Sequence, residues 1–361
     1  MLLALVLAVL LALLPVQARP APPPDAPVEA FVSEAPEAGQ TDRLMLHNLL
    51  TGEQPTVPVT GNRYSIVGPQ IVFFDESSGR VLAMGADGEV GEHPLIQPSA
   101  GARRIDWTYS PEADLVAWTV TEGSPDALTT TTYAASPEGA GARLVLRDGP
   151  RAGIRAFPIG FSEDGGTLYM DYQPDTIADI APLRQYAAMF ALDLATGGAS
   201  SLPGEASCYC GGGVGSGQFV RLALADAGFD VRVYDLNRGS SRVIPSLGMA
   251  EYTQAGDLTI SPDGSKAAYT LLQLVPGGQP GELRAIYVVV DLVNGTQRAL
   301  NAGNPDERLL RPAAWAEDSR ALLMNDPAEA GTWRLDVNTG TLRQVASASY
   351  IGSTVPPASL R

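Results

Sequence analysis

Lysine, histidine and cysteine are scarce in this chain of 361 residues, which contains one lysine, two histidines and two cysteines. Charged residues make up 18% of it, and 40 acidic residues against 24 basic ones give a net charge of −16. Nucleic acid and anionic membrane surfaces are therefore poor partners. The two histidines both precede position 100, so few catalytic triads or histidine-ligated metal sites can be assembled.

Motifs of several enzyme classes are missing as well. The sequence has no Gly-x-Ser-x-Gly elbow, no Walker loop and no Gly-x-Gly-x-x-Gly run after a strand. It also lacks an Asp-x-Asp-x-Asp-Gly calcium loop. These absences favour a protein that is not an enzyme and needs no cofactor or metal. They leave open an enzyme that uses acidic residues alone.

The N-terminus has the pattern of a targeting segment. An unbroken apolar run from Leu2 to Leu14 is shorter than the ~20 residues of a membrane span. Val16-Gln17-Ala18 favours cleavage after Ala18, so we predict a signal peptide over 1–18 and a location outside the cytoplasm, secreted or in the cell envelope. No basic residue precedes the run, and an uncleaved membrane anchor is the alternative. Residues 19–41, rich in Pro, Ala and Glu, are predicted to be a linker.

What the sequence has in abundance is turns, with 38 glycines and 29 prolines. Four ten-residue windows align without gaps, each with a large apolar residue, a polar turn containing an acidic residue, and an apolar strand. They are Tyr109–Trp118, Phe161–Met170, Ile260–Tyr269 and Trp315–Met324. Weaker copies occupy Tyr64–Phe73 and the glycine-rich stretch 211–217. The period is about 50 residues, the size of a four-stranded propeller blade.

A second motif, Asp-Leu-x-x-Gly or a close variant, alternates with the first and predicts another hairpin. Its copies start at Asn48, Asp193, Asp235, Asp291 and Asp336, with shorter equivalents at Asp87-Gly88 and Asp148-Gly149. The acidic residues of both motifs, including Asp164 and Asp263, are interpreted as caps of structural turns.

Together these hairpins resemble the TolB-like β-propeller repeat, and also the propeller of prolyl-oligopeptidase relatives. The resemblance covers roughly residue 42 to the C-terminus and implies an all-β fold of four-stranded antiparallel blades over 42–361. We favour seven blades, with six as the alternative. The hairpin at 43–58 lacks inner strands before it, and Tyr350–Val355 can supply one, so that both termini share a blade and close the ring.

In such blades the two repeated turns lie on one face, and the connections between second and third strands lie on the other. Long loops are predicted there over Thr119–Gly141, Asp171–Tyr186 and Leu271–Glu282, and long loops on a rigid scaffold often bind ligands. The candidate ligand-binding residues are Tyr133, Asp171, Tyr172, Asp175, Asp179 and Arg184.

Cys208 and Cys210 are separated by one residue. In an exported protein they favour a strained disulfide, with free thiols, a metal site or an intermolecular bond as alternatives. The function expected overall is that of an exported, non-enzymatic binding or scaffold propeller whose partner is an extracytoplasmic protein, peptide or glycan. The alternative is a hydrolase or lyase that uses acidic residues in the central funnel.

Overall fold

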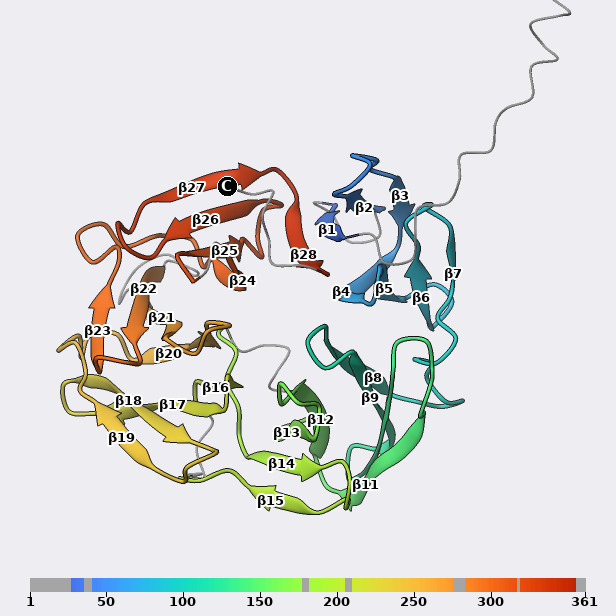
Figure 1. The fold of residues 1–361 in the computed structure, drawn as a ribbon, viewed down its shortest axis with the longest axis horizontal. Coiled ribbons are helices and arrows are strands. Elements are labelled where there is room, and N and C mark those ends of the chain that lie inside the picture. Colours follow the sequence, from blue (N-terminus) through green and yellow to red (C-terminus); the bar gives the residue numbers. More distant parts are fainter. Residues whose placement is uncertain are drawn as a thin grey trace, which may run out of the picture.

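The chain forms a ring of seven four-stranded antiparallel blades around a central channel (Figure 1). The computed structural model describes residues 27–35, 41–176, 182–204, 210–274, 283–316 and 319–354. Within those ranges the chain forms 28 strands and no helix. The predicted all-β propeller is confirmed, and the count is seven blades, not six.

The first three blades come from the two chain ends and the first 151 residues. Their strands are given from the channel outward. Blade 1 contains β28 (Ser349–Ser353), β1 (Val28–Ser33), β2 (Asp42–Asn48) and β3 (Thr56–Val59). Blade 2 contains β4 (Gly61–Val67), β5 (Gln70–Asp75), β6 (Arg80–Met84) and β7 (Val90–Glu92). Blade 3 contains β8 (Arg104–Ser110), β9 (Leu115–Ser124), β10 (Ala127–Ala135) and β11 (Arg143–Arg151).

The remaining four blades follow in chain order. Blade 4 contains β12 (Ile154–Phe161), β13 (Thr167–Pro174), β14 (Met189–Asp193) and β15 (Ala199–Ser201). Blade 5 contains β16 (Gly212–Gly215), β17 (Gln218–Ala225), β18 (Gly228–Asp235) and β19 (Ser241–Ile244). Blade 6 contains β20 (Gln254–Ile260), β21 (Lys266–Leu274), β22 (Leu283–Asp291) and β23 (Thr296–Ala299). Blade 7 contains β24 (Arg311–Ala316), β25 (Ala321–Asn325), β26 (Thr332–Asp336) and β27 (Leu342–Ala346).

Blade 1 closes the ring, because its innermost strand comes from the C-terminus and the other three from the N-terminus (Figure 1). The expected contribution of the C-terminal segment is confirmed by β28, which pairs with β1. The domain boundary differs from the expected one, since β1 lies inside the stretch 19–41 that composition assigned to a linker. Val28, Ala30 and Val32 of β1 are buried. The prolines around this short strand dominate the composition of residues 19–41, which is why composition alone indicated a linker.

The core lies between the blades. The described residues form seven hydrophobic clusters, one for each interface between neighbouring sheets. At the closing interface, Phe31 of β1 and Tyr350 of β28 meet edge to face with ring centroids 5.6 Å apart, and they pack against Leu323 of blade 7. Asn325 of blade 7 also bonds the main chain of Tyr350, accepting from its N–H at 3.0 Å and donating to its carbonyl at 2.7 Å. Ring closure is therefore held by side-chain packing as well as by strand pairing.

The repeated acidic residues cap turns, as predicted. Asp291 accepts hydrogen bonds from the N–H groups of Val293 and Asn294 at 2.9 and 2.8 Å. The main-chain and side-chain N–H groups of Asn294 lower the pKa of Asp291, so this cap stabilises the fold above about pH 4 and is lost as pH falls through the lowered pKa. Asn48 makes the same contacts with its amide oxygen, at 3.0 and 3.1 Å.

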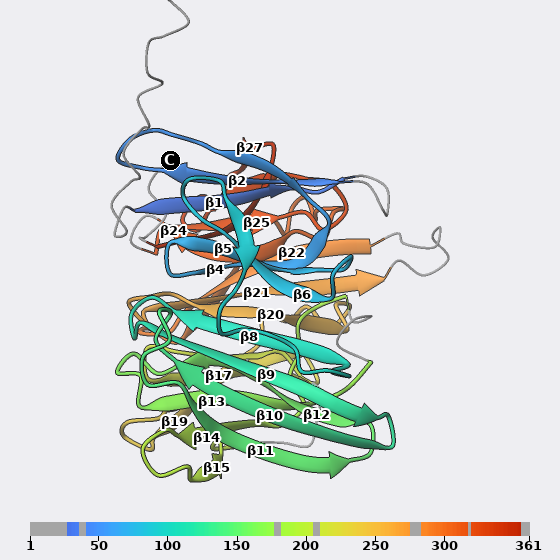
Figure 2. The same cartoon turned by 90° about the vertical axis from the view of Figure 1, so that its right-hand side faces the viewer.

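Blade 3 corrects two expectations. The stretch 119–141 is not a long loop, because β9 and β10 form an extended hairpin with only two residues between them. Figure 2 shows both as long arrows that run side by side in opposite directions. Thr129 to Thr132 favour this strand, since branched side chains suit a pleated sheet. Asp148-Gly149 is not a turn either, since both residues lie within β11 and the chain reverses at 136–142.

No helix in the described part of the chain is long and apolar enough to cross a membrane. The predicted signal peptide, 1–18, lies outside the described residues.

The closing interface makes Tyr350 a test of ring closure. Tyr350→Ala should lower the free energy of unfolding by about 3 kcal/mol, because it empties a packed site between the two chain ends. Leu224→Ala is the control, since Leu224 is 74% exposed and its loss should change stability by less than about 0.5 kcal/mol. Urea unfolding measures both. Equal, small losses would show that ring stability does not depend on this interface.

Candidate functional site

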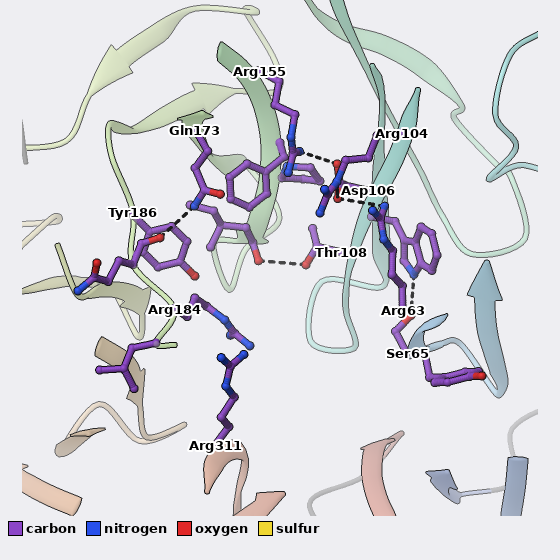
Figure 3. Close-up of a pocket in the computed structure, with 17 residues that line it drawn as sticks. Arg63, Ser65, Arg104, Asp106, Thr108, Arg155, Gln173, Arg184, Tyr186 and Arg311 are labelled. Carbon is purple, nitrogen blue, oxygen red and sulfur yellow. Dashed lines mark hydrogen bonds and ion pairs between the residues drawn. The ribbon is translucent and has the colours of Figure 1, made fainter. Parts of the chain in front are cut away.

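The channel contains a pocket of about 440 Å³. Its walls are inner strands of blades 2, 3, 4 and 7 and a segment of blade 4 that follows β13 (Figure 3). A pocket of this size suits a small molecule. Its position at the axis means that residues far apart in the sequence meet in it.

The pocket is strongly basic. Five arginines line it, and one aspartate, Asp106, is the only acidic residue among the described lining residues. The arginines are Arg63, Arg104, Arg155, Arg184 and Arg311. Arginines thus outnumber carboxylates among the described lining residues of this pocket, in a chain whose net charge is −16.

Asp106 organises three of these arginines, and the four residues are called the Asp106 cluster below. Its Oδ1 accepts from Arg104 Nε at 3.1 Å and lies 3.4 Å from Arg63 Nη1, while its Oδ2 accepts from Arg155 Nη1 at 2.6 Å. Arg155 is 2% exposed, and its Nε lies 3.5 Å from Asp175 Oδ1. Charge-assisted bonds of this kind fix the planes of the guanidinium groups.

Backbone bulges aim two of the site's side chains. Arg63 in β4 and Asp257 in β20 have φ values of +58° and +54°, and each lies where the pairing register of its inner strand shifts. A left-handed conformation costs a residue such as arginine about 1–2 kcal/mol. Bulges re-aim side chains, and strained residues gather at functional sites. The other three described non-glycine residues with positive φ, Asp114, Ser216 and Ser319, lie in turns between strands, so Arg63 and Asp257 are the two on inner strands at the channel.

Residues 182–188, called the channel segment below, cross the channel wall and carry Arg184 (Figure 3). Asp171, which is fully buried, accepts from the N–H groups of Ala187 and Ala188 at 3.2 and 2.7 Å. Gln173 donates to the carbonyl of Gln185 at 3.0 Å. The segment is therefore held to blade 4 by side chains of β13.

The same segment is also tied to blades 5, 6 and 7. Tyr186 and Cys210 exchange two main-chain hydrogen bonds, of 2.8 and 3.0 Å. The N–H of Asp257 donates to the carbonyl of Arg184 at 3.0 Å, and Asp257 Oδ1 accepts from the N–H of Arg184 at 2.7 Å. Arg311 donates to the carbonyl of Pro182 at 2.5 Å. Four blades thus hold one short segment in place.

Arg184 and Arg311 point toward one another in Figure 3 and are called the Arg184–Arg311 pair below. Tyr186 and Asp257 raise the pKa of Arg184 against the opposing effect of burial, so its guanidinium stays charged. Burial raises the pKa of Asp257, whose Oδ2 lies 3.9 Å from Arg311 Nε. Burial also raises the pKa of Tyr186 and keeps its phenol neutral.

Apolar side chains also line part of the pocket. Trp107, Phe157 and Ile159 line the pocket together with Tyr186. The indole N–H of Trp107 donates to Ser65 Oγ at 2.6 Å, so its hydrogen-bonding need is met within the wall. The arrangement can therefore hold an anionic group by charge and a non-polar group by contact.

The described residues contain no group of three His, Cys, Asp or Glu side chains placed to hold a metal ion. The acidic residues of the channel, Asp106 and Asp257, each bond to main-chain or guanidinium N–H groups. The guanidinium groups of the pocket present hydrogen-bond donors and positive charge that suit an anionic group.

Of the residues predicted from the sequence, Arg184 lines the pocket. Asp171, which was expected on a loop, lies in β13 and bonds the channel segment, and Asp175 forms ion pairs with Arg103 and Arg155. Tyr133 lies in β10, where its ring stacks on Trp118 with centroids 5.4 Å apart. Tyr172 lies in β13, stacked on Phe190 at 4.7 Å under the guanidinium of Arg151. Neither tyrosine lies on a loop, which corrects that expectation.

Two predicted residues, Asp179 and Cys208, lie outside the described residues. Cys210 is disulfide-bonded. Its main chain also forms an isolated antiparallel β-bridge with Tyr186. The predicted pairing of Cys208 with Cys210 stays a prediction.

Sequence reasoning missed four of the five arginines. Arg63, Arg104, Arg155 and Arg311 each lie on an inner strand, before or at the start of a repeated hairpin. Alternation was the available signal: Arg104, Asp106 and Thr108 share one side of β8, as do Arg155, Phe157 and Ile159 of β12. Polar residues at alternate positions of an inner strand face the channel.

Fold and pocket together define a seven-bladed β-propeller with an arginine-lined channel. The propeller implied by the resemblance to TolB-like repeats is therefore present. No protein-family model matches the chain, and no curated protein matches it by sequence.

Solved structures similar to it include a prolyl endopeptidase, at a TM-score of 0.60 and 12% identity over 92% of this chain and 52% of that one. The chain thus spans about half the endopeptidase's length. A putative 6-phosphogluconolactonase from Bacteroides uniformis matches at 0.51 and 12%, over 91% and 99%. A putative TolB from Agrobacterium tumefaciens matches at 0.43 and 12%, over 76% and 88%. The first two likenesses show the fold.

Gly256 tests whether close packing holds the channel segment. A Cβ at Gly256 would lie 2.7 Å from the carbonyl oxygen of Arg184 and 2.8 Å from Leu183 Cβ. Gly256→Ala should therefore displace the segment, lower stability by about 1–3 kcal/mol and speed tryptic cleavage after Arg184. Gly160→Ala is the matched control, since Gly160 also lies at an inner-strand bulge but has open space around it. Unchanged cleavage in Gly256→Ala would contradict the assignment.

Proposed function

We propose that this protein is a binding propeller that holds a small anionic molecule in its channel pocket. The observation that supports this most is the convergence of five arginines and one aspartate in a single pocket of an acidic chain. Arginine suits the task because its planar guanidinium presents five donors in a fixed fork that matches carboxylate and phosphate groups. The sequence led us to expect a protein, peptide or glycan partner. We now propose that the pocket binds an anionic group, which is either a free molecule or a part of such a partner.

The field inside the channel supports the same proposal. Walls of protein around a concentration of one sign of charge focus the potential and attract ligands of the opposite sign. Asp106 holds the cluster in fixed geometry, so little conformational freedom is lost when a ligand binds. The negative outer charge does not compete with this attraction, because it is screened within about 10 Å in ordinary buffers.

The alternative, a hydrolase or lyase, receives less support from the geometry. It requires an acid or base that can exchange a proton with substrate. Asp106 is shared among three guanidinium groups, and Asp257 bonds to the main chain of Arg184. Both carboxylates hold arginines in place, which is the work of a binding site.

Anion binding can be measured by calorimetry on the full chain at low salt with sulfate, phosphate and citrate. At least one of these should bind, with an affinity that falls as salt rises, while the cation 1,6-diaminohexane should not bind. Arg311→Gln should weaken binding by about 10- to 100-fold, the loss expected for one charge-assisted contact. Arg343→Gln is the matched control, because Arg343 is exposed in β27, away from the channel, and should leave the affinity unchanged.

Two results would overturn this proposal. Either none of the three anions binds a protein that is shown to be folded, or Arg343→Gln weakens binding as much as Arg311→Gln does. The second result would mean that the anions bind diffusely to the outer surface.

We also propose that the protein is exported, with a mature chain that begins near Arg19. The apolar run from Leu2 to Leu14 and the small residues before Arg19 support this. N-terminal sequencing of the protein recovered from the host's envelope or medium should read from Arg19. A cytoplasmic protein that retains Met1 would contradict it.

A further inference from the structure

A second pocket lies between blades 4 and 5, on the face of the ring that carries the repeated turns, and is called the blade 4–5 pocket below. It has a volume of about 570 Å³, which suits a small molecule. Its walls are the turns that follow β12, β16 and β18, together with β15 and the residues after it. Among the described residues, none lines both this pocket and the channel pocket. The two sites are therefore separate.

The glycine-rich stretch that departs from the repeat forms one wall of the blade 4–5 pocket. Two residues, Ser216 and Gly217, connect β16 to β17, whereas five connect the corresponding strands of blade 4 (162–166) and of blade 6 (261–265). Gly215, Ser216 and Gly217 all line the pocket. A short turn of small residues leaves room beside blade 4. The unusual turn of blade 5 thus coincides with a cavity.

Tyr169 of β13 brings a hydroxyl without a partner to this pocket. Its ring is packed in the hydrophobic cluster between blades 4 and 5, and the residue is only 8% exposed. The phenol of Tyr269, which is also buried, donates to Gln297 at 2.7 Å, but that of Tyr169 has no hydrogen bond to any described residue. A buried polar group without a partner is costly. A hydroxyl on a ligand would satisfy it.

Two carboxylates at the rim also have oxygens open to a ligand. Asp164 Oδ1 accepts from Ser162 Oγ at 2.6 Å and from the N–H of Gly166 at 3.0 Å. Asp164 Oδ2 and the carboxylate of the exposed Glu163 accept no hydrogen bond from a described residue. Burial raises the pKa of the Tyr169 phenol, and the charges of Asp164 and Glu163 raise it further, so the phenol keeps its proton. It can therefore donate to a ligand as well as accept.

The chemistry of the lining favours a neutral ligand rich in hydroxyl groups. Several polar groups both donate and accept, namely the hydroxyls of Tyr169, Ser200 and Ser201 and the amide of Asn237. No arginine, lysine or histidine is among the described lining residues, which disfavours an anion. An ammonium ion offers donors alone, whereas each hydroxyl of a ligand matches both kinds of group. The aromatic rings of Phe161 and Tyr169 add faces that attract C–H groups.

We propose that the blade 4–5 pocket binds a polyhydroxylated ring, the chemistry of a sugar. Tyr169 and Glu163 bond hydroxyls of the ring, and the aromatic side chains contact its C–H groups. A free monosaccharide and the terminal unit of a glycan chain both present such a ring. This site is additional to the proposed anion site, and neither depends on the other.

The test measures sugar binding to the full chain by ligand-observed NMR, with glucose, galactose, N-acetylglucosamine, maltotriose and chitotriose as probes. At least one should bind, and Tyr169→Phe should weaken that binding about threefold to tenfold, the loss expected for one hydrogen bond. The same variant should leave the midpoint of urea unfolding unchanged, because the lost hydroxyl has no partner among the described residues. Glu163→Ala should also weaken binding by about threefold or more.

Two matched variants serve as controls. Tyr252 is another buried tyrosine whose hydroxyl has no partner among the described residues, but it lies between blades 5 and 6. Glu138 is exposed in a turn of blade 3. Tyr252→Phe and Glu138→Ala should leave sugar affinity unchanged. Binding of a monosaccharide would identify a free sugar as sufficient, and binding of a trisaccharide alone would identify a chain end; both results support the proposal.

Three results would overturn it. None of the five sugars binds the folded protein, or Tyr169→Phe affects binding no more than Tyr252→Phe does. In the third, no sugar binds but hexylamine does, with an affinity that depends on Tyr169, so that the pocket selects a cation. Each of these results leaves the binding of phosphate, sulfate and citrate in the channel unaffected.

Discussion

Closure of the ring is the constraint on which the rest of this structure depends. Seven twisted sheets can surround one axis only if the last blade meets the first, and here β28 pairs with β1 to make that join. Phe31 and Tyr350 fill the interface, and Asn325 bonds the main chain of the closing strand. Closure turns seven innermost strands into the walls of one channel. It thereby brings Arg63 and Arg311, 248 positions apart in the sequence, into the same pocket.

The channel depends in turn on a few contacts of short range. Asp106 gathers three guanidinium groups, and Asp257 and Asp171 fix the channel segment by its main-chain N–H groups. Gly256 allows that segment to approach β20 closely. The acidic residues of the channel therefore serve mainly to position arginines and backbone. This division of work agrees with the proposed binding of an anion by so acidic a chain.

The fold was accessible from the sequence because its information is local and repeated. A hairpin turn needs only an acidic cap and a glycine a few residues apart, and Asp291 and Gly295 provide both in one five-residue stretch. Blade 3 departs from the pattern. There, the run of threonines before Tyr133 belongs to strand β10. Asp148-Gly149 has the composition of a turn but lies within strand β11. Strand β1 was hidden in the same way by neighbouring prolines.

The site was less accessible, because its residues share no motif and meet only through ring closure. Arg184 was found because it lies on a long connection, whereas Arg63, Arg104, Arg155 and Arg311 lie on strands that the repeats identify only as structural. Alternation along β8 and β12 carries the missing signal, but it acquires meaning only once those strands are known to face the axis. The left-handed backbone at Arg63 and Asp257 is visible in the structure alone.

The central claim, that the channel is an anion site, is tested most directly by locating anions in a crystal of the protein soaked in bromide. Anomalous scattering identifies bromide without ambiguity. The account predicts strong bromide peaks inside the channel pocket, in contact with its arginines. Peaks scattered over surface arginines, with none in the channel, would contradict it.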